Sequence, residues 1–156
     1  MRVHICAVGR LRQAPERALY DDYLTRFDRT GRQLALGPAQ LLEVEDKKGG
    51  GMAAEAVLLR RAIPDGALIC TLDERGKVMS SPDFAQMLGD WRDQGRQDLA
   101  FVIGGADGID PDLRAQADAS LSFGKMVWPH MLVRVMLAEQ LYRAASILAG
   151  SPYHRA

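Results

Sequence analysis

Short apolar runs alternate with amphipathic segments along this chain. Four runs have the length and residue types of buried strands, and a fifth, weaker run lies within 120–128. The four clear runs are 3–8, 39–45, 67–74 and 99–105. Between them, apolar positions recur at helical spacing. This pattern predicts helices over about 15–28, from about 52, from 81, over about 110–119 and over about 131–149.

The alternation of buried strands with helices predicts an α/β fold. Continuous apolar strands favour a mainly parallel sheet with helices on both faces. No linker interrupts the pattern, so residues 1–156 are expected to form a single domain. Ligands of such sheets bind beyond the carboxyl ends of the strands. The segments at those ends are 71–74, 104–105 and the residues after Phe123.

Composition and charge narrow the class of protein. The 156 residues are 47% hydrophobic and 26% charged, which is typical of a globular protein. We find no signal peptide and no run of membrane-spanning length, so a cytoplasmic protein without membrane contact is expected. The formal net charge is zero, but from Lys125 onward four lysines and arginines stand against Glu139 alone. This local positive excess suits an RNA partner only if the site also lies there.

The two cysteines and three histidines of the sequence do not form a metal-binding pattern. Cys6 and Cys70 each lie within an apolar run, so buried thiols in a reducing compartment are predicted. A buried disulfide between them is the less favoured alternative. The histidines are dispersed and no Cys-x-x-Cys occurs, so no metal site is predicted.

Glycines and charges gather at the predicted strand ends. In "FVIGGADGID", Gly104 and Gly105 would let backbone amides approach a ligand, although a plain tight turn explains them equally well. In "TLDERGK", Asp73 and Glu74 would point to opposite sides of a strand, so a solvated strand end is predicted. The lysines of "DKKGGG" (46–51) belong to a surface loop that could close over phosphates.

Polar residues also crowd the start of the last predicted helix. The segment "FGKMVWPHMLVR" brings together Lys125, Trp128, His130 and Arg134, the last two a helical turn apart. A neutral histidine packed at a helix start is the alternative to a functional role.

Three chemically capable residues end the chain. Tyr153 can stack on a base, His154 can exchange a proton near neutral pH, and Arg155 can hold phosphate. A frayed terminus is the alternative, since chain ends are usually poorly ordered.

Two other functions compete at this level. A nicotinamide-dependent oxidoreductase would need a G-x-G-x-x-G fingerprint after the first strand, where Gly9 stands alone. A non-catalytic RNA- or ribosome-binding module would leave the glycine-rich strand ends unexplained.

The segments "IGGADG", "FGKMVWPHMLVRVMLAEQLYRA" and "SPYHRA" together resemble the SPOUT-class methyltransferases that modify N3 of a pseudouridine in 23S ribosomal RNA. The segments "AVGR" and "TLDERGK" are also similar, and the resemblance spans the whole chain. It implies an S-adenosylmethionine-dependent enzyme, a homodimer with sites near the interface, and a ribosomal substrate. It also implies a deep trefoil knot in the C-terminal half, which no sequence rule would propose.

The resemblance also implies which residues carry the site. His154 and His130 are the candidate bases, Arg134 and Arg155 would stabilise charge, and Tyr153 would stack on the target base. The implied cofactor contacts are Leu72, Gly104 with its neighbour Gly105, Gly124, Lys125, Met126, Val127, Trp128 and Pro129.

Overall fold

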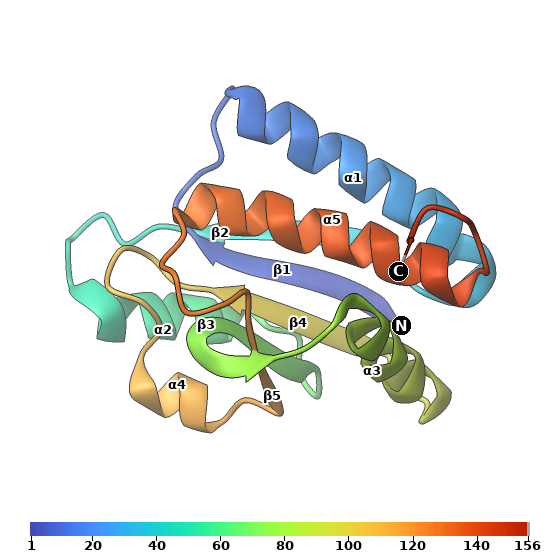
Figure 1. Ribbon diagram of the computed structural model, residues 1–156. Coiled ribbons are helices and arrows are strands. Elements are labelled where there is room, and N and C mark those ends of the chain that lie inside the picture. Colours follow the sequence, from blue (N-terminus) through green and yellow to red (C-terminus); the bar gives the residue numbers. More distant parts are fainter. Residues whose placement is uncertain (156) are drawn as a thin grey trace.

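A five-stranded parallel sheet forms the centre of the computed structural model, which describes residues 1–155 (Figure 1). The strand order is β2-β1-β4-β3-β5, and each neighbouring pair runs parallel. The strands are β1 (Arg2–Val8), β2 (Ala39–Val44), β3 (Leu68–Val78), β4 (Asp98–Ile103) and β5 (Ala119–Ser122).

Helices cover both faces of this sheet, as Figure 1 shows. Helices α1, α3 and α5 pack on one face, and α2 and α4 pack on the other. The predicted α/β architecture is therefore confirmed. Within residues 1–155, no helix is both long and apolar enough to cross a bilayer. The helices are α1 (Pro15–Gly31), α2 (Gly51–Ala62), α3 (Ser81–Asp93), α4 (Pro111–Ala115) and α5 (His130–Leu148), with a 3₁₀ turn at Arg32–Leu34.

Strand β1 shows why these runs are apolar throughout. Val3 and Ile5 face the layer of α1, α3 and α5, whereas Cys6 and Val8 face α2. Successive side chains point to opposite faces, so a strand covered on both sides needs apolar residues at every position. Cys6 and Cys70 are buried free thiols, as predicted, and the disulfide alternative is wrong.

Some predicted boundaries are wrong around the edge of the sheet. Strand β3 continues past residue 74 to Val78, with a register shift against β5 between Leu72 and Lys77. At this shift β3 and β5 approach each other closely, since a Cβ on Gly76 would lie 2.7 Å from Ser120 Oγ. The weaker strand expected within 120–128 is confirmed as β5, which begins one residue earlier and ends at Ser122, and a loop follows it.

The segments at the carboxyl ends of the strands meet at one edge of the sheet, because all strands point the same way. Helix α5 begins at this edge and runs back along the sheet towards the opposite end. The last described residues therefore lie at the far end of α5 from the strand-end loops (Figure 1).

Candidate functional site

A cavity of about 650 Å³ lies at the carboxyl ends of β3, β4 and β5. Its size is within the range of small-molecule sites in proteins. Apart from Lys125, whose side chain is exposed, the structure places each of the expected cofactor residues on its wall. These wall residues are Leu72, Gly104, Gly105, Gly124, Met126, Val127, Trp128 and Pro129.

A tight turn after β4 forms one side of the cavity. The Gly108 N–H donates to the Gly105 carbonyl at 3.0 Å, and Gly108 has a φ of +84°. A Cβ on Gly104 would lie 2.6 Å from the carbonyl carbon of Gly108. The tight-turn explanation of these glycines is confirmed, and the turn also lines the cavity, so the approach of a ligand to its backbone stays a prediction.

The loop between β5 and α5 forms the opposite side. Ser122 Oγ accepts a hydrogen bond from the Gly124 N–H at 3.0 Å, and Gly124 then turns the chain with a φ of +113°. Beyond the turn, Met126 and Val127 are 74% and 79% exposed. A loop of exposed apolar side chains beside backbone amides can cover an aromatic ring and read its edge.

Asp73 differs from its prediction as a solvated strand end. Its side chain is only 4% exposed, and its carboxylate accepts from the Arg75 backbone N–H at 2.8 Å and from Arg75 Nε at 3.1 Å. Arg114 Nε lies 3.9 Å from the other oxygen. The prediction fails because β3 continues past this position and Asp73 is enclosed, whereas Glu74 is exposed.

His130 begins α5 and lines the cavity. Burial lowers the pKa of its imidazole, and the neighbouring Arg134 guanidinium lowers it further. Its Nδ1 atom is buried and has no hydrogen-bond partner in the described part of the chain. The arrangement favours a neutral imidazole beside the cavity at neutral pH.

Arg134 does not line the cavity. Its side chain is fully buried; Nη1 donates to Glu43 Oε2 at 2.8 Å, and Nη2 donates to the Val8 and Gly9 carbonyls at 2.9 and 2.8 Å. Arg134 thus holds the start of α5 against the ends of β1 and β2. The role of Glu43 could not be predicted from the sequence, because a glutamate at the end of a strand looks like an ordinary solvent-facing residue.

The C-terminal tail is folded against α5. The Tyr153 hydroxyl donates to Glu139 Oε1 at 3.0 Å, and Arg143 Nη1 lies 3.2 Å from His154 Nδ1. Burial and the hydrogen bond to Glu139 raise the pKa of Tyr153 to about 12. The frayed-end alternative is therefore wrong for Tyr153 and His154, while Arg155 is exposed.

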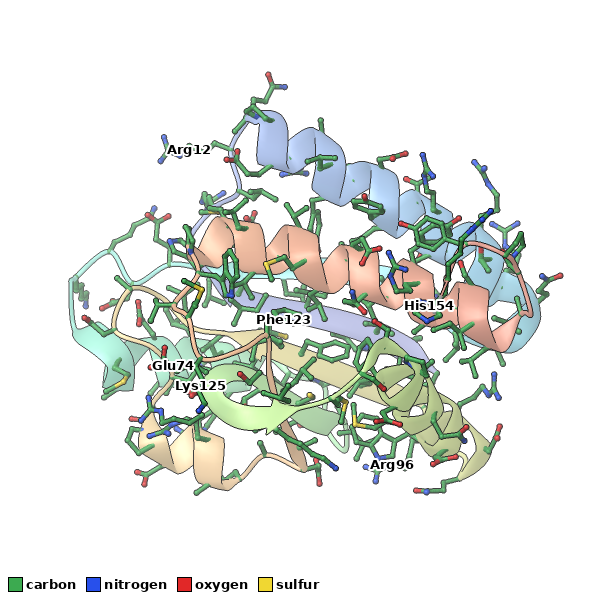
Figure 2. The ribbon with its side chains drawn as sticks, in the orientation of Figure 1. Arg12, Glu74, Arg96, Phe123, Lys125 and His154 are labelled. Carbon is green, nitrogen blue, oxygen red and sulfur yellow. The ribbon has the colours of Figure 1, made fainter. Side chains whose placement is uncertain are left out.

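The structure separates the expected catalytic residues into two groups. Arg143, which contacts His154, follows His130 by about 20 Å along the axis of α5, at about 1.5 Å per residue. Figure 2 shows His154 near the end of α5 remote from Lys125 and Glu74. The tail, as far as it is described to Arg155, does not contribute to the cavity wall of its own chain.

The chain combines a parallel sheet covered by helices on both faces, a cavity lined by glycine turns and a long final helix. A family model described as "Predicted SPOUT methyltransferase" matches residues 1–154, and the chain belongs to the SPOUT methyltransferase family. Membership in a methyltransferase family counts against the oxidoreductase and the non-catalytic alternatives.

Particular relatives are similar over their full length. The protein named "Ribosomal RNA large subunit methyltransferase H" from Ruegeria sp. (strain TM1040) is 77% identical over 99% of both chains. The protein of the same name from Cereibacter sphaeroides (strain ATCC 17025 / ATH 2.4.3) is 68% identical over the same share. A probable methylase family protein from Haemophilus influenzae Rd KW20 has a similar structure, with a TM-score of 0.53 at 11% identity. That likeness covers 99% of this chain and 70% of the other, and it supports the fold alone.

Proposed function

We propose that residues 1–156 act as one domain that methylates large-subunit ribosomal RNA, at N3 of a pseudouridine in the 23S molecule of the assembled ribosome. The observation that carries this proposal is the 77% identity, over 99% of both chains, to a protein named for methylation of that RNA. The assembled ribosome also places the enzyme in the cytoplasm.

The methyl donor of this family is S-adenosylmethionine, whose sulfonium carries an activated methyl group. The cavity residues fit this molecule. Exposed apolar side chains of Met126 and Val127 can cover the adenine ring, and the Gly124 backbone, with open space where a Cβ would be, leaves room for close approach. Calorimetric titration with S-adenosylmethionine, and with NAD as the control, tests this assignment. Binding of NAD alone would contradict it.

The chain's own residues have to position the target nucleobase and remove the proton from its N3 atom. N3 of a uracil-type ring is protonated and becomes nucleophilic only when that proton leaves. The neutral imidazole of His130 lines the cavity and is suited to accept it, and His154 is the second candidate.

Arg155 is exposed and can meet phosphate. The Tyr153 ring already contacts the Tyr142 ring, with 4.5 Å between their centroids, and the Arg143 guanidinium, so it is better suited to hold the tail in place than to stack on the target base. Arg134 is buried away from the cavity wall, so its role is to hold the helix that carries His130 and not, as expected, to stabilise charge on the substrate.

A homodimer would unite the two groups of residues. The tail lies about 20 Å from the cavity of its own protomer, as measured along α5. Around the cavity, Met126, Val127, Trp128 and Leu132 are exposed apolar side chains that a second copy would cover. The tail of one protomer then completes the cavity of its partner. The expected trefoil knot stays a prediction alongside this arrangement.

Mixed dimers test the shared site. One subunit would carry Gly104→Ala, whose Cβ would collide with the Gly108 backbone and distort the turn that lines the cavity, and the other His154→Ala, which disables the tail. A shared site leaves one cavity and one tail intact, so the mixed dimer is expected to keep about half of the wild-type activity. A tail that acts on its own protomer's cavity would leave no active site in the mixed dimer.

The substrate is tested on ribosomes from cells that lack this protein. Purified protein and S-adenosylmethionine should add one methyl group to a pseudouridine of the 23S RNA, located by mass mapping of RNA fragments. Methylation elsewhere, or none, would overturn the substrate assignment. Naked 23S RNA serves as the comparison for the assembled particle.

A further inference from the structure

Glu139 organises the side chains around the C-terminal tail. Its Oε1 accepts from Arg143 Nε at 3.0 Å, from Arg143 Nη2 at 2.6 Å and from the Tyr153 hydroxyl at 3.0 Å. Its Oε2 accepts from Gln140 Nε2 at 2.9 Å, and Gln140 in turn accepts from Ser81 Oγ at 2.7 Å. The carboxylate is 18% exposed, and its contacts tie the tail to both α5 and the start of α3.

This arrangement fixes the direction of the Arg143 guanidinium. Two of its nitrogens are bound to Glu139, which lies one helical turn earlier, and its carbon lies 4.8 Å from the centre of the Tyr153 ring. The third nitrogen, Nη1, points to His154 Nδ1 at 3.2 Å. A planar guanidinium held at several points is pre-organised, so the imidazole meets a fixed donor.

The contact determines which imidazole nitrogen carries hydrogen. A guanidinium has only donors, so His154 Nδ1 must be the acceptor. A neutral imidazole has one N–H, which in His154 must then be Nε2–H. His154 can therefore interact with a substrate through its Nε2–H, as a hydrogen-bond donor.

We propose that Glu139 and Arg143 are positioning residues that hold His154 as its Nε2–H tautomer, so that His154 donates a hydrogen bond to the substrate rather than acting as its general base. The proposal rests on the proposed function for the identity of the substrate. The acceptor is one of the two carbonyl oxygens on the carbons that flank N3, where negative charge grows as the N3 proton leaves. A fixed donor aimed at such an oxygen stabilises the transition state. The departing proton would go to the neutral imidazole of His130, and N3 would take the methyl carbon as its bond to the sulfonium of the donor breaks, which leaves a neutral thioether.

Nitrogen NMR of the full-length protein, with ¹⁵N-labelled histidine, tests the tautomer without any activity. At mildly alkaline pH the His154 signals should show an unprotonated Nδ1 and a protonated Nε2, assigned by their loss in His154→Gln. In Arg143→Ala a measurable share of the Nδ1–H tautomer should appear beside Nε2–H, because the fixed donor that excludes it is gone. A protonated Nδ1 in the wild type, or no change in Arg143→Ala, would overturn the proposal.

Single-turnover methylation of ribosomes tests the donor role. In His154→Gln the side-chain amide replaces Nε2–H, whereas in His154→Asn it replaces the Nδ1 side. We expect His154→Gln to keep its rate within about 10-fold of the wild type, and His154→Asn to lose about 100-fold or more. Equal losses in both variants, or a larger loss in His154→Gln, would contradict the donor role.

Arg143→Lys serves as the conservative variant. It keeps the positive charge, but a single ammonium cannot donate to Glu139 and His154 with the fixed planar geometry of a guanidinium. It should lower the rate by about 10-fold or more without changing the melting temperature by more than the control Asp21→Asn does. Asp21 belongs to an exposed pair with Arg17, also one helical turn apart. If the wild type methylates no ribosomal RNA, the proposed function fails, and the NMR result still decides the tautomer.

Discussion

Arg134 on α5 and Glu43 on β2 form an ion pair of 2.8 Å between residues 91 positions apart in the sequence. The arginine side chain is fully buried and the glutamate side chain is 21% exposed. The same guanidinium donates to the carbonyls of Val8 and Gly9, so it joins the last helix to two strands beside the cavity. His130 sits one turn earlier on the same helix, and its position depends on this connection.

Replacement of Arg134 by leucine should therefore be strongly destabilising. It would leave Glu43 without its buried partner and two carbonyls without a donor, at a cost of about 3–5 kcal/mol in the free energy of unfolding. Urea denaturation measures this. Arg10→Leu removes the exposed partner of Glu45 and should cost less than about 1 kcal/mol. Equal costs for the two variants would show that the buried pair contributes no more than a surface pair.

Gly124 should tolerate alanine poorly because of its backbone rather than for lack of space. Its φ is +113°, and a Cβ there would meet no atom within 4 Å. Gly124→Ala should lower stability by about 1–2 kcal/mol and weaken S-adenosylmethionine binding about 10-fold, as the loop shifts to relieve strain. Calorimetry measures the affinity. Gly66→Ala is the matched control, with a φ of +76° in open space away from the cavity. Gly66→Ala should lower stability by a similar amount and leave the affinity for S-adenosylmethionine unchanged. A comparable loss of affinity in Gly66→Ala would contradict this prediction.

His130 should make stability fall on mild acidification. Burial and Arg134 lower its pKa in the folded state below the unfolded value of about 6.5. Between the two values the unfolded chain binds more protons, so stability falls as the pH drops from about 6.5 towards the folded-state pKa. Thermal unfolding over a pH series should show a shallower fall for His130→Gln than for the wild type. Identical slopes would mean that His130 titrates alike in both states.

Both cysteines should be inert in the folded protein. Burial raises the pKa of Cys6 and of Cys70 to about 12, so neither is a thiolate at neutral pH. A thiol-specific colorimetric reagent should report no rapid reaction in the native state and two thiols per chain in denaturant. Rapid labelling of one cysteine before unfolding would contradict its burial.

The sequence predicted the sheet well and the loops less well, for a physical reason. β1 and β4 are apolar at nearly every position because both faces are covered, and such runs are readily recognised. In the segment after Ser122, the same apolar pattern belongs to an exposed loop, where Met126 and Val127 face solvent beside the cavity. Local pattern cannot distinguish an apolar residue that packs in the core from one that awaits a ligand or a partner.

The sequence by itself determined the alternation of strands and helices, the glycine turns at the strand ends and, by resemblance, the family. Each of these depends on neighbouring residues or on motifs that the chain carries contiguously. Tertiary structure decided that Arg134 is a buried link to Glu43, that Asp73 is enclosed, and that the tail folds onto Glu139 and Arg143. Those outcomes depend on contacts between distant segments and on the length of α5, which carries His154 away from its own cavity. The proposal that both ends of α5 serve one site therefore calls for two copies of the chain.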